Sequence, residues 1–188
     1  MAIDELDRKI LRLLSQNPEI SQSEISESLR ISQPAVNMRI HKLQEKGVLA
    51  RLVGVNVKKA ELFLAKIDVS TNNTEPLLNF VNNCPLYFNS FLTSGRYNLM
   101  IFLIGENVRS LMSCVDTHLR QNALIKDYIT DMEFSIIVTP VQDFVVPIKP
   151  VLDKKKTAPC GTDCSSCSLH GDRCLGCPAT IHYKGALL

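Results

Sequence analysis

Residues 21–49 read SQSEISESLRISQPAVNMRIHKLQEKGVL, and this stretch decides the fold of the N-terminal region. Its opening, Ser21-Gln22-Ser23-Glu24, has the S-x-x-E form of a capping box, in which the serine hydroxyl and the glutamate carboxylate satisfy free amide groups at a helix start. Ser32 can cap a second helix, Pro34 is tolerated in its first turn, and Gly47 is a typical C-terminal stop. The stretch therefore predicts a short helix, a turn and a longer helix.

A further helix precedes this pair. Asp4 can cap it, apolar residues recur at helical spacing from Leu6 to Leu14, and Asn17-Pro18 stops the run. Three helices in this order, with the last one basic on its outer face, predict a helix-turn-helix whose third helix enters the major groove of DNA. Asn and Gln amides can pair with adenine, whereas Arg and Lys can reach guanine or phosphate. The candidate DNA-binding residues are Ser32, Gln33, Asn37, Met38, Arg39, His41 and Lys42.

The charge around the third helix agrees with this interpretation. Residues 30–59 carry seven Lys or Arg side chains against one acidic side chain, Glu45, and such a patch suits phosphates. Residues 48–57 then alternate like a β-hairpin wing around Gly54. The alternatives are a basic helix face that is merely solvated, or a protein-interaction module with a vestigial helix-turn-helix.

Three segments in this region match a known pattern: LDRKIL at residues 6–11, ISQPAV at 31–36 and IHKLQEKGVL at 40–49. On these segments the chain resembles the Lrp/AsnC (feast/famine) transcription regulators. The resemblance implies a winged helix-turn-helix over residues 1–60, followed by an effector-sensing and oligomerising domain. Such domains form homodimers by sheet-to-sheet packing and often assemble further into octamers. We therefore expect a dimer that binds a roughly palindromic operator in double-stranded DNA.

Residues 61–140 predict an α+β domain of the ferredoxin-like kind, with helices on one face of an antiparallel sheet. The expected order is βαββαβ, with strands at 63–69, around 87–93, at 97–104 and at 125–138, and helices at 75–83 and 107–121. Cys84 and Cys114 are expected to be ordinary small buried residues.

The resemblance also implies an effector site in this domain. A Gly-x-aromatic-Asp turn that lies near the effector pocket in many Lrp/AsnC proteins would fall at residues 95–98, so Gly95, Tyr97 and Asn98 are effector-binding candidates. Asn98 stands where the acid would be. Without a carboxylate to receive an amino group, an amino acid is a weaker candidate for the ligand.

A connector over residues 141–158, containing prolines and a run of lysines, is not expected to form a packed domain. The cysteine-rich tail over residues 159–188 follows it. Five of the seven cysteines lie in this tail with the spacing C-x3-C-x2-C-x6-C-x2-C, namely Cys160, Cys164, Cys167, Cys174 and Cys177. A segment this short cannot build its own apolar core, so a bound metal is the natural source of its order.

Four thiolates suit a structural zinc ion, and thiolates alone also suit an iron–sulfur cluster. Five closely spaced cysteines exceed what one zinc ion needs, and the closing Cys-Pro resembles ferredoxin sequences, so we favour a [4Fe-4S] cluster over zinc. His170 and His182 are further candidate ligands, although histidines in a polar tail are usually solvated. Bare thiols that form disulfides are the remaining alternative.

The function expected from these features is a DNA-binding transcription regulator that responds to redox state or metal through its tail. A regulator with a small-molecule effector and a purely structural zinc tail is the second interpretation. The C-x3-C-x2-C spacing also occurs in radical S-adenosylmethionine enzymes, but too few residues remain for their barrel, so no enzyme is expected. The chain has 188 residues, lacks an apolar run long enough to span a membrane and opens on acidic residues, so a cytoplasmic protein is expected.

Overall fold

The computed structural model describes residues 3–149 and 151–186. The chain divides into two compact units, and the boundary falls between Leu52 and Val53. No helix within the described residues is both long and apolar enough to cross a membrane.

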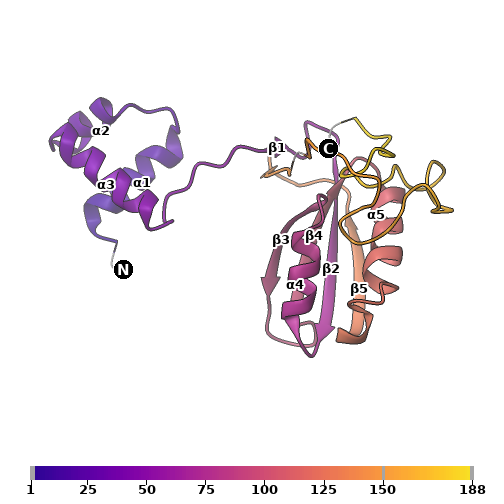
Figure 1. Cartoon of the computed structure of the whole chain (residues 1–188). Coiled ribbons are helices and arrows are strands. Elements are labelled where there is room, and N and C mark those ends of the chain that lie inside the picture. Colours follow the sequence, from indigo (N-terminus) through magenta and orange to yellow (C-terminus); the bar gives the residue numbers. More distant parts are fainter. Residues whose placement is uncertain (1–2, 150, 187–188) are drawn as a thin grey trace. The chain divides into compact units, whose positions relative to one another are not determined.

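The N-terminal unit contains three helices, α1 (Glu5–Gln16), α2 (Gln22–Leu29) and α3 (Gln33–Glu45) (Figure 1). Both expected caps of the helix pair are present. Ser21 and Glu24 form a reciprocal capping box at α2, and the Ser32 hydroxyl accepts the Ala35 amide at α3. Ile10, Ile25 and Val36, one from each helix, are fully buried against one another. The three-helix prediction is confirmed.

The expected hairpin wing does not form as predicted. Val55–Asn56 is a strand, β1, but it pairs antiparallel with β6 (Val145–Val146) and not with the preceding residues. Alternation gives a strand one apolar face and does not say which partner buries it. Here Val57 and Val146 are buried together in a small core with Leu62.

The β1–β6 pair also shows that part of the connector, residues 141–158, is packed. Because β6 lies within residues 141–158 and Val146 is buried, part of this segment is docked on the second unit. Gly54 approaches β6 so closely that an added Cβ would come within 2.2 Å of the Val146 carbonyl oxygen. The first residues of the second unit thus pair with the segment that connects the main sheet to the tail.

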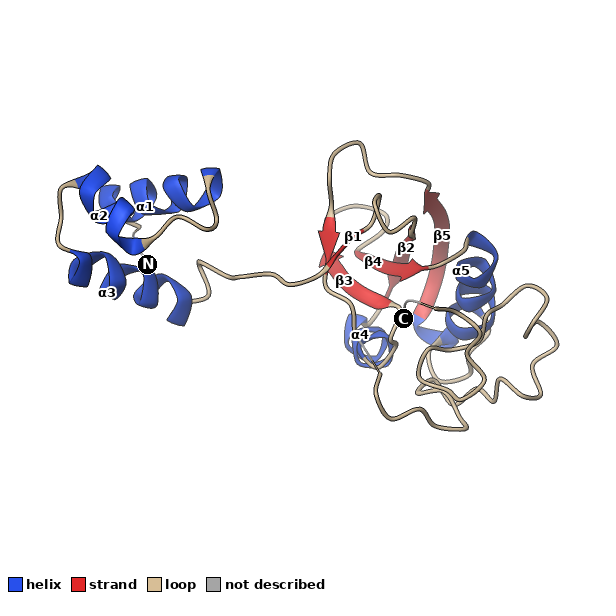
Figure 2. Ribbon diagram, turned by 90° about the horizontal axis from the view of Figure 1, so that it is seen from above, coloured by secondary structure: helices blue, strands red, loops and turns tan. Residues whose placement is uncertain are grey.

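The main sheet has the strand order β3-β4-β2-β5, and every neighbouring pair is antiparallel. Its strands are β2 (Phe63–Thr71), β3 (Tyr87–Leu92), β4 (Leu99–Gly105) and β5 (Ile129–Ile137). Two helices cover one face, α4 (Thr74–Asn82) and α5 (Val108–Cys114) (Figure 2). The βαββαβ order is therefore as predicted.

Two local features depart from the regular pattern. Helix α5 continues without a break as a π-helix, η1 (Val115–Arg120), and a short 3-10 turn, η2 (Lys126–Tyr128), precedes β5. The last strand consequently begins at Ile129, four residues later than the apolar pattern suggested.

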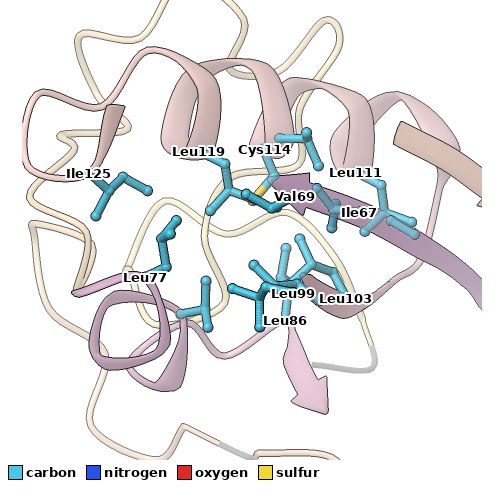
Figure 3. Packing of buried hydrophobic residues seen from close by; sticks show 14 residues of the cluster. Ile67, Val69, Leu77, Leu86, Leu99, Leu103, Leu111, Cys114, Leu119 and Ile125 are labelled. Carbon is cyan, nitrogen blue, oxygen red and sulfur yellow. The ribbon is translucent and has the colours of Figure 1, made fainter. Parts of the chain in front are cut away.

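The main core lies between the sheet and its helices, as Figure 3 shows. Its buried apolar side chains come from β2 and β4 (Ile67, Val69, Leu99, Leu103), from α4 (Leu77), from α5 and η1 (Leu111, Cys114, Leu119) and from the loops (Leu86, Ile125). The opposite face carries an ion pair between Lys66 and Asp68, 2.7 Å apart, and aromatic side chains toward its β3 edge.

The described part of the tail, residues 159–186, forms turns and isolated bridges. It is fastened to the start of α5: the Leu175 amide donates to the Ser110 hydroxyl at 2.9 Å, and the Tyr183 hydroxyl donates to the Glu106 carboxylate. The Ala186 amide also donates to Glu106, at 2.9 Å. The tail therefore lies beside α5 and η1 (Figures 1 and 2).

Candidate DNA-binding helix and cysteine cavity

Helix α3 presents an exposed polar face. Its buried stripe, Val36, Ile40 and Leu43, packs into the N-terminal unit, and this packing fixes the outward direction of the other side chains. Six of the seven predicted DNA-binding residues are exposed, namely Ser32, Gln33, Asn37, Met38, His41 and Lys42. Amides, a cation and a thioether at successive turns of one helix can read base edges and phosphates in a major groove.

Arg39 has a different role from the one the sequence suggested. Its guanidinium lies 2.6 Å from the Asp4 carboxylate and 2.7 Å from that of Asp7, whose side chain is only 8% exposed. These bonds raise the pKa of Arg39 and fasten α3 to the first turn of α1. Ser32, similarly, serves as the N-cap of α3. Both residues therefore have structural partners within the unit.

The three effector candidates lie at the β3–β4 turn. Gly95 has a φ of +118°, a conformation that favours glycine. The Asn98 side chain donates to the Thr71 carbonyl at 2.8 Å and accepts the Thr71 amide at 3.0 Å. It thus pins the end of β2, while the Tyr97 ring lies beneath the Arg96 guanidinium. Whether these residues contact an effector stays a prediction.

All seven cysteines line one small cavity between the tail and the helix-covered side of the sheet domain. The cavity has a volume of about 60 Å³. The cysteines that line it are Cys84, Cys114, Cys160, Cys164, Cys167, Cys174 and Cys177, together with His118 and His170. Cys114 is buried in the main core and Cys84 packs against it, as the sequence suggested, and both also line this cavity.

On the domain side of the cavity, Cys160 contacts His118 of η1. Its Sγ lies 3.5 Å from His118 Nδ1 and 3.5 Å from the Thr162 hydroxyl, which itself lies 3.0 Å from His118 Nδ1. Burial raises the pKa of Cys160, but the bonds to His118 and Thr162 outweigh it and lower the value to about 7. The thiols of Cys84 and Cys114 are hydrogen-bonded to each other.

On the tail side, turns bring the remaining cysteines together. The Gly176 amide donates to Cys174 Sγ at 3.4 Å, and Gly176 has a φ of +89°. His170 does not aim freely into the cavity, because its Nε2 lies 2.8 Å from the His182 carbonyl oxygen. Burial, followed by the neighbouring thiols, raises the pKa of Cys177 to about 12.

The cysteines of this structure are free thiols. Within residues 3–149 and 151–186, no three His, Cys, Asp or Glu side chains lie close enough to hold a single metal ion as they stand. The thiols surround a space and do not converge on one point.

His118 is a lining residue that the sequence analysis did not single out. The signal was present, because Cys114 and His118 are four residues apart on one predicted helix and such positions share a face. Its proximity to Cys160, which is 42 residues away in the sequence, requires the fold.

The comparisons with known proteins agree with the first unit's architecture. A family described as winged helix-turn-helix DNA-binding matches residues 3–50. An uncharacterized HTH-type transcriptional regulator of Pyrococcus abyssi is 28% identical over 128 residues, covering 63% of this chain and 79% of its own length. The HTH-type transcriptional regulator LysM of Saccharolobus solfataricus is 27% identical over 116 residues, or 61% and 82% of the two chains.

Among solved structures, AsnC of E. coli superposes with a TM-score of 0.62 and 17% identity. The match covers 77% of this chain and 98% of AsnC. At this identity the likeness concerns the fold.

Proposed function

We propose that this chain, a DNA-binding transcription regulator of the Lrp/AsnC type and not an enzyme, reads its operator with α3 as a homodimer and is regulated by a metal centre in the cysteine cavity. The observation that carries the metal proposal is the gathering of every cysteine of the chain around one small cavity. The DNA-binding proposal rests on the exposed polar face of α3.

For DNA reading, we assign base contacts to Gln33, Asn37 and His41, and a phosphate or guanine contact to Lys42. Arg39 is left out, since its guanidinium is already bonded to two carboxylates of α1. Footprinting on promoter DNA should give paired protections on one face of the duplex, as expected for a twofold protein. A single unpaired footprint would contradict the dimeric reading mode.

For the dimer, we propose that a second copy covers the sheet face opposite the helices. This face is lined by Phe88, Phe91, Phe102 and Phe144 around a groove of about 230 Å³, and Phe91 is 52% exposed. Aromatic patches of this kind are typical of interfaces. Light scattering should show that Phe91→Lys shifts the dimer toward monomer, whereas Met112→Lys, an equally exposed apolar position on α5, does not.

For the metal centre, the cavity size favours a cluster over a single ion. One water needs about 10–15 Å³ on the same measure, so about 60 Å³ accommodates several atoms. Soft thiolates are the ligands that iron–sulfur clusters and zinc prefer. We propose that tail cysteines among Cys160, Cys164, Cys167, Cys174 and Cys177 hold a [4Fe-4S] cluster, with zinc as the alternative that elemental analysis distinguishes. Anaerobic purification should give a brown protein.

Regulation follows from how little else orders the tail. If two of its thiols form a disulfide, they release two electrons and two protons, which reduce one hydrogen peroxide to two waters. Such a pair no longer binds metal, and the tail then loses its contacts with Ser110 and Glu106 in the sheet domain. We propose that this change alters the dimer and thereby its affinity for DNA.

The test compares operator binding by the wild type with that of Cys164→Ala/Cys174→Ala, in reduced and oxidised buffer. We expect the wild type to change its affinity on oxidation and the variant to be insensitive. Equal binding by both proteins in both buffers would remove the sensor role and leave the DNA-binding role intact.

A further inference from the structure

We infer that Cys84, Cys114 and His118 of the sheet domain complete the metal site, so that the centre is bound across the seam between tail and domain. This inference rests on the metal centre proposed above. It changes the expected ligand set, because the tail motif alone would place the whole centre within residues 159–188.

Two separate parts of the sheet domain, a loop and a continuous helix, supply these side chains. Cys84 lies in the loop between α4 and β3, Cys114 ends α5, and His118 belongs to η1. All three line the same cavity as the tail cysteines. A domain that built only its own core would have no reason to direct two thiols and an imidazole at one small space.

Cys160 connects the two sides. Its Sγ lies 3.5 Å from His118 Nδ1, and its carbonyl oxygen accepts from the Asn122 amide at 3.4 Å. The Cys114 sulfur lies among the packed side chains of the core in Figure 3. Its free thiol is hydrogen-bonded to the thiol of Cys84. The domain thus brings two thiols and an imidazole to the wall of the cavity that the first tail cysteine also lines.

The form of the helix supports the same assignment. Cys114 and His118 straddle the change from α5 to the π-helical η1, and π-helical turns inside helices frequently occur at functional sites. The combined set also exceeds four ligands: five tail thiols, two domain thiols and one imidazole surround a space of several atoms. This number suits a multinuclear centre better than one tetrahedral ion.

The experiment uses the full chain, loaded anaerobically with ferrous iron and sulfide in one series and with Zn²⁺ alone in another. The variants are Cys84→Ala, Cys114→Ala and His118→Gln. His182→Gln is the matched control, because this histidine belongs to the tail and does not line the cavity. Chelator competition should show metal affinity lowered about 10- to 100-fold in the three variants, the range typical of residues that support a metal site.

Because alanine in the core also loosens packing, a second measurement isolates ligation. X-ray absorption at the iron or zinc edge should detect a nitrogen neighbour in the wild type and in His182→Gln, and none in His118→Gln. Thermal unfolding of the metal-free proteins reports the packing effect separately.

The outcomes are distinguishable. If the wild type binds neither metal, the proposed metal centre fails and this inference fails with it. If the wild type binds metal and Cys164→Ala/Cys174→Ala does not, while the three domain variants bind with wild-type affinity and no nitrogen neighbour is seen, the centre belongs to the tail alone and this inference is overturned.

Discussion

In the N-terminal unit, Ile10, Ile25 and Val36 are fully buried among three capped helices. The described part of the tail, residues 159–186, buries few apolar side chains, Cys164 and Ala179 among them, and forms only turns and bridges. Both segments are short. The first is stabilised by apolar packing that the sequence pattern reveals. The second has side-chain hydrogen bonds to the start of α5 and, in our proposal, a metal centre in the cysteine cavity. The difference teaches that a motif can specify ligands without specifying a fold.

The largest expected effect is metal withdrawal, which should affect one region and spare the other. We expect amides of residues 155–183 to exchange at near the unfolded rate once metal is removed, because metal binding is the main free energy available to order such a segment. Amides of α1–α3 should keep their protection. Hydrogen exchange with mass spectrometry measures both regions in one sample, and a tail that stays protected without metal would break the comparison.

The reciprocal change is Ile25→Ala in the N-terminal unit. This side chain is fully buried, so we expect the free energy of unfolding of that unit to fall by about 2–4 kcal/mol. Metal content should be unchanged. Denaturant titration followed by circular dichroism gives the first quantity and elemental analysis the second; loss of metal would show that the regions are not independent.

A glycine pair makes the same change in both regions. Gly47 has a φ of +66° with nothing within 4 Å of an added Cβ, so Gly47→Ala should cost the N-terminal unit about 1–2 kcal/mol of backbone strain. At Gly176 the added Cβ would also lie 3.1 Å from the His182 carbonyl oxygen. Gly176→Ala should therefore lower metal affinity as well, which chelator competition measures. Unchanged affinity would mean that this turn does not shape the cavity.

The smallest effect separates two cations of α3. Arg39→Ala should lower the stability of the N-terminal unit by about 1 kcal/mol, because its bonds to two carboxylates are partly exposed to solvent. Its salt dependence of DNA binding should match the wild type. Lys42→Ala should leave stability unchanged and reduce the salt slope by about 0.9 if it contacts one phosphate. If Arg39→Ala reduced the salt slope of DNA binding and Lys42→Ala did not, Arg39 would belong to the DNA interface.

The sequence predicts the helices well because their signals are local. Capping residues such as Ser21 and Glu24 lie three positions apart, and apolar spacing identifies the buried face directly. The βαββαβ order was predictable for the same reason. The partner of β1 was not predictable, because Val55 pairs with Val146, which is far away in the sequence, and no local pattern encodes that choice.

The site was predictable only in part. The tail spacing identifies five candidate ligands, but Cys84 and His118 approach them through packing of α4, α5 and the tail, which periodicity does not describe. Likewise, a basic residue on a recognition helix is ordinarily assigned to DNA. Only the folded structure shows that the Arg39 guanidinium forms ion pairs with the carboxylates of Asp4 and Asp7.

The β1–β6 pair joins the start of the sheet domain to the segment that follows β5. Because Val55 and Asn56 pair with Val146 and Val145, the two ends of the segment between these strands are held together. Fraying that starts in the tail must break this strand pair before it reaches β5. Gly54 allows the two segments to approach closely, since no larger residue fits against the Val146 carbonyl. If the tail loses its order, we therefore expect the sheet to keep its shape, because the β1–β6 pair lies between β5 and the tail along the chain.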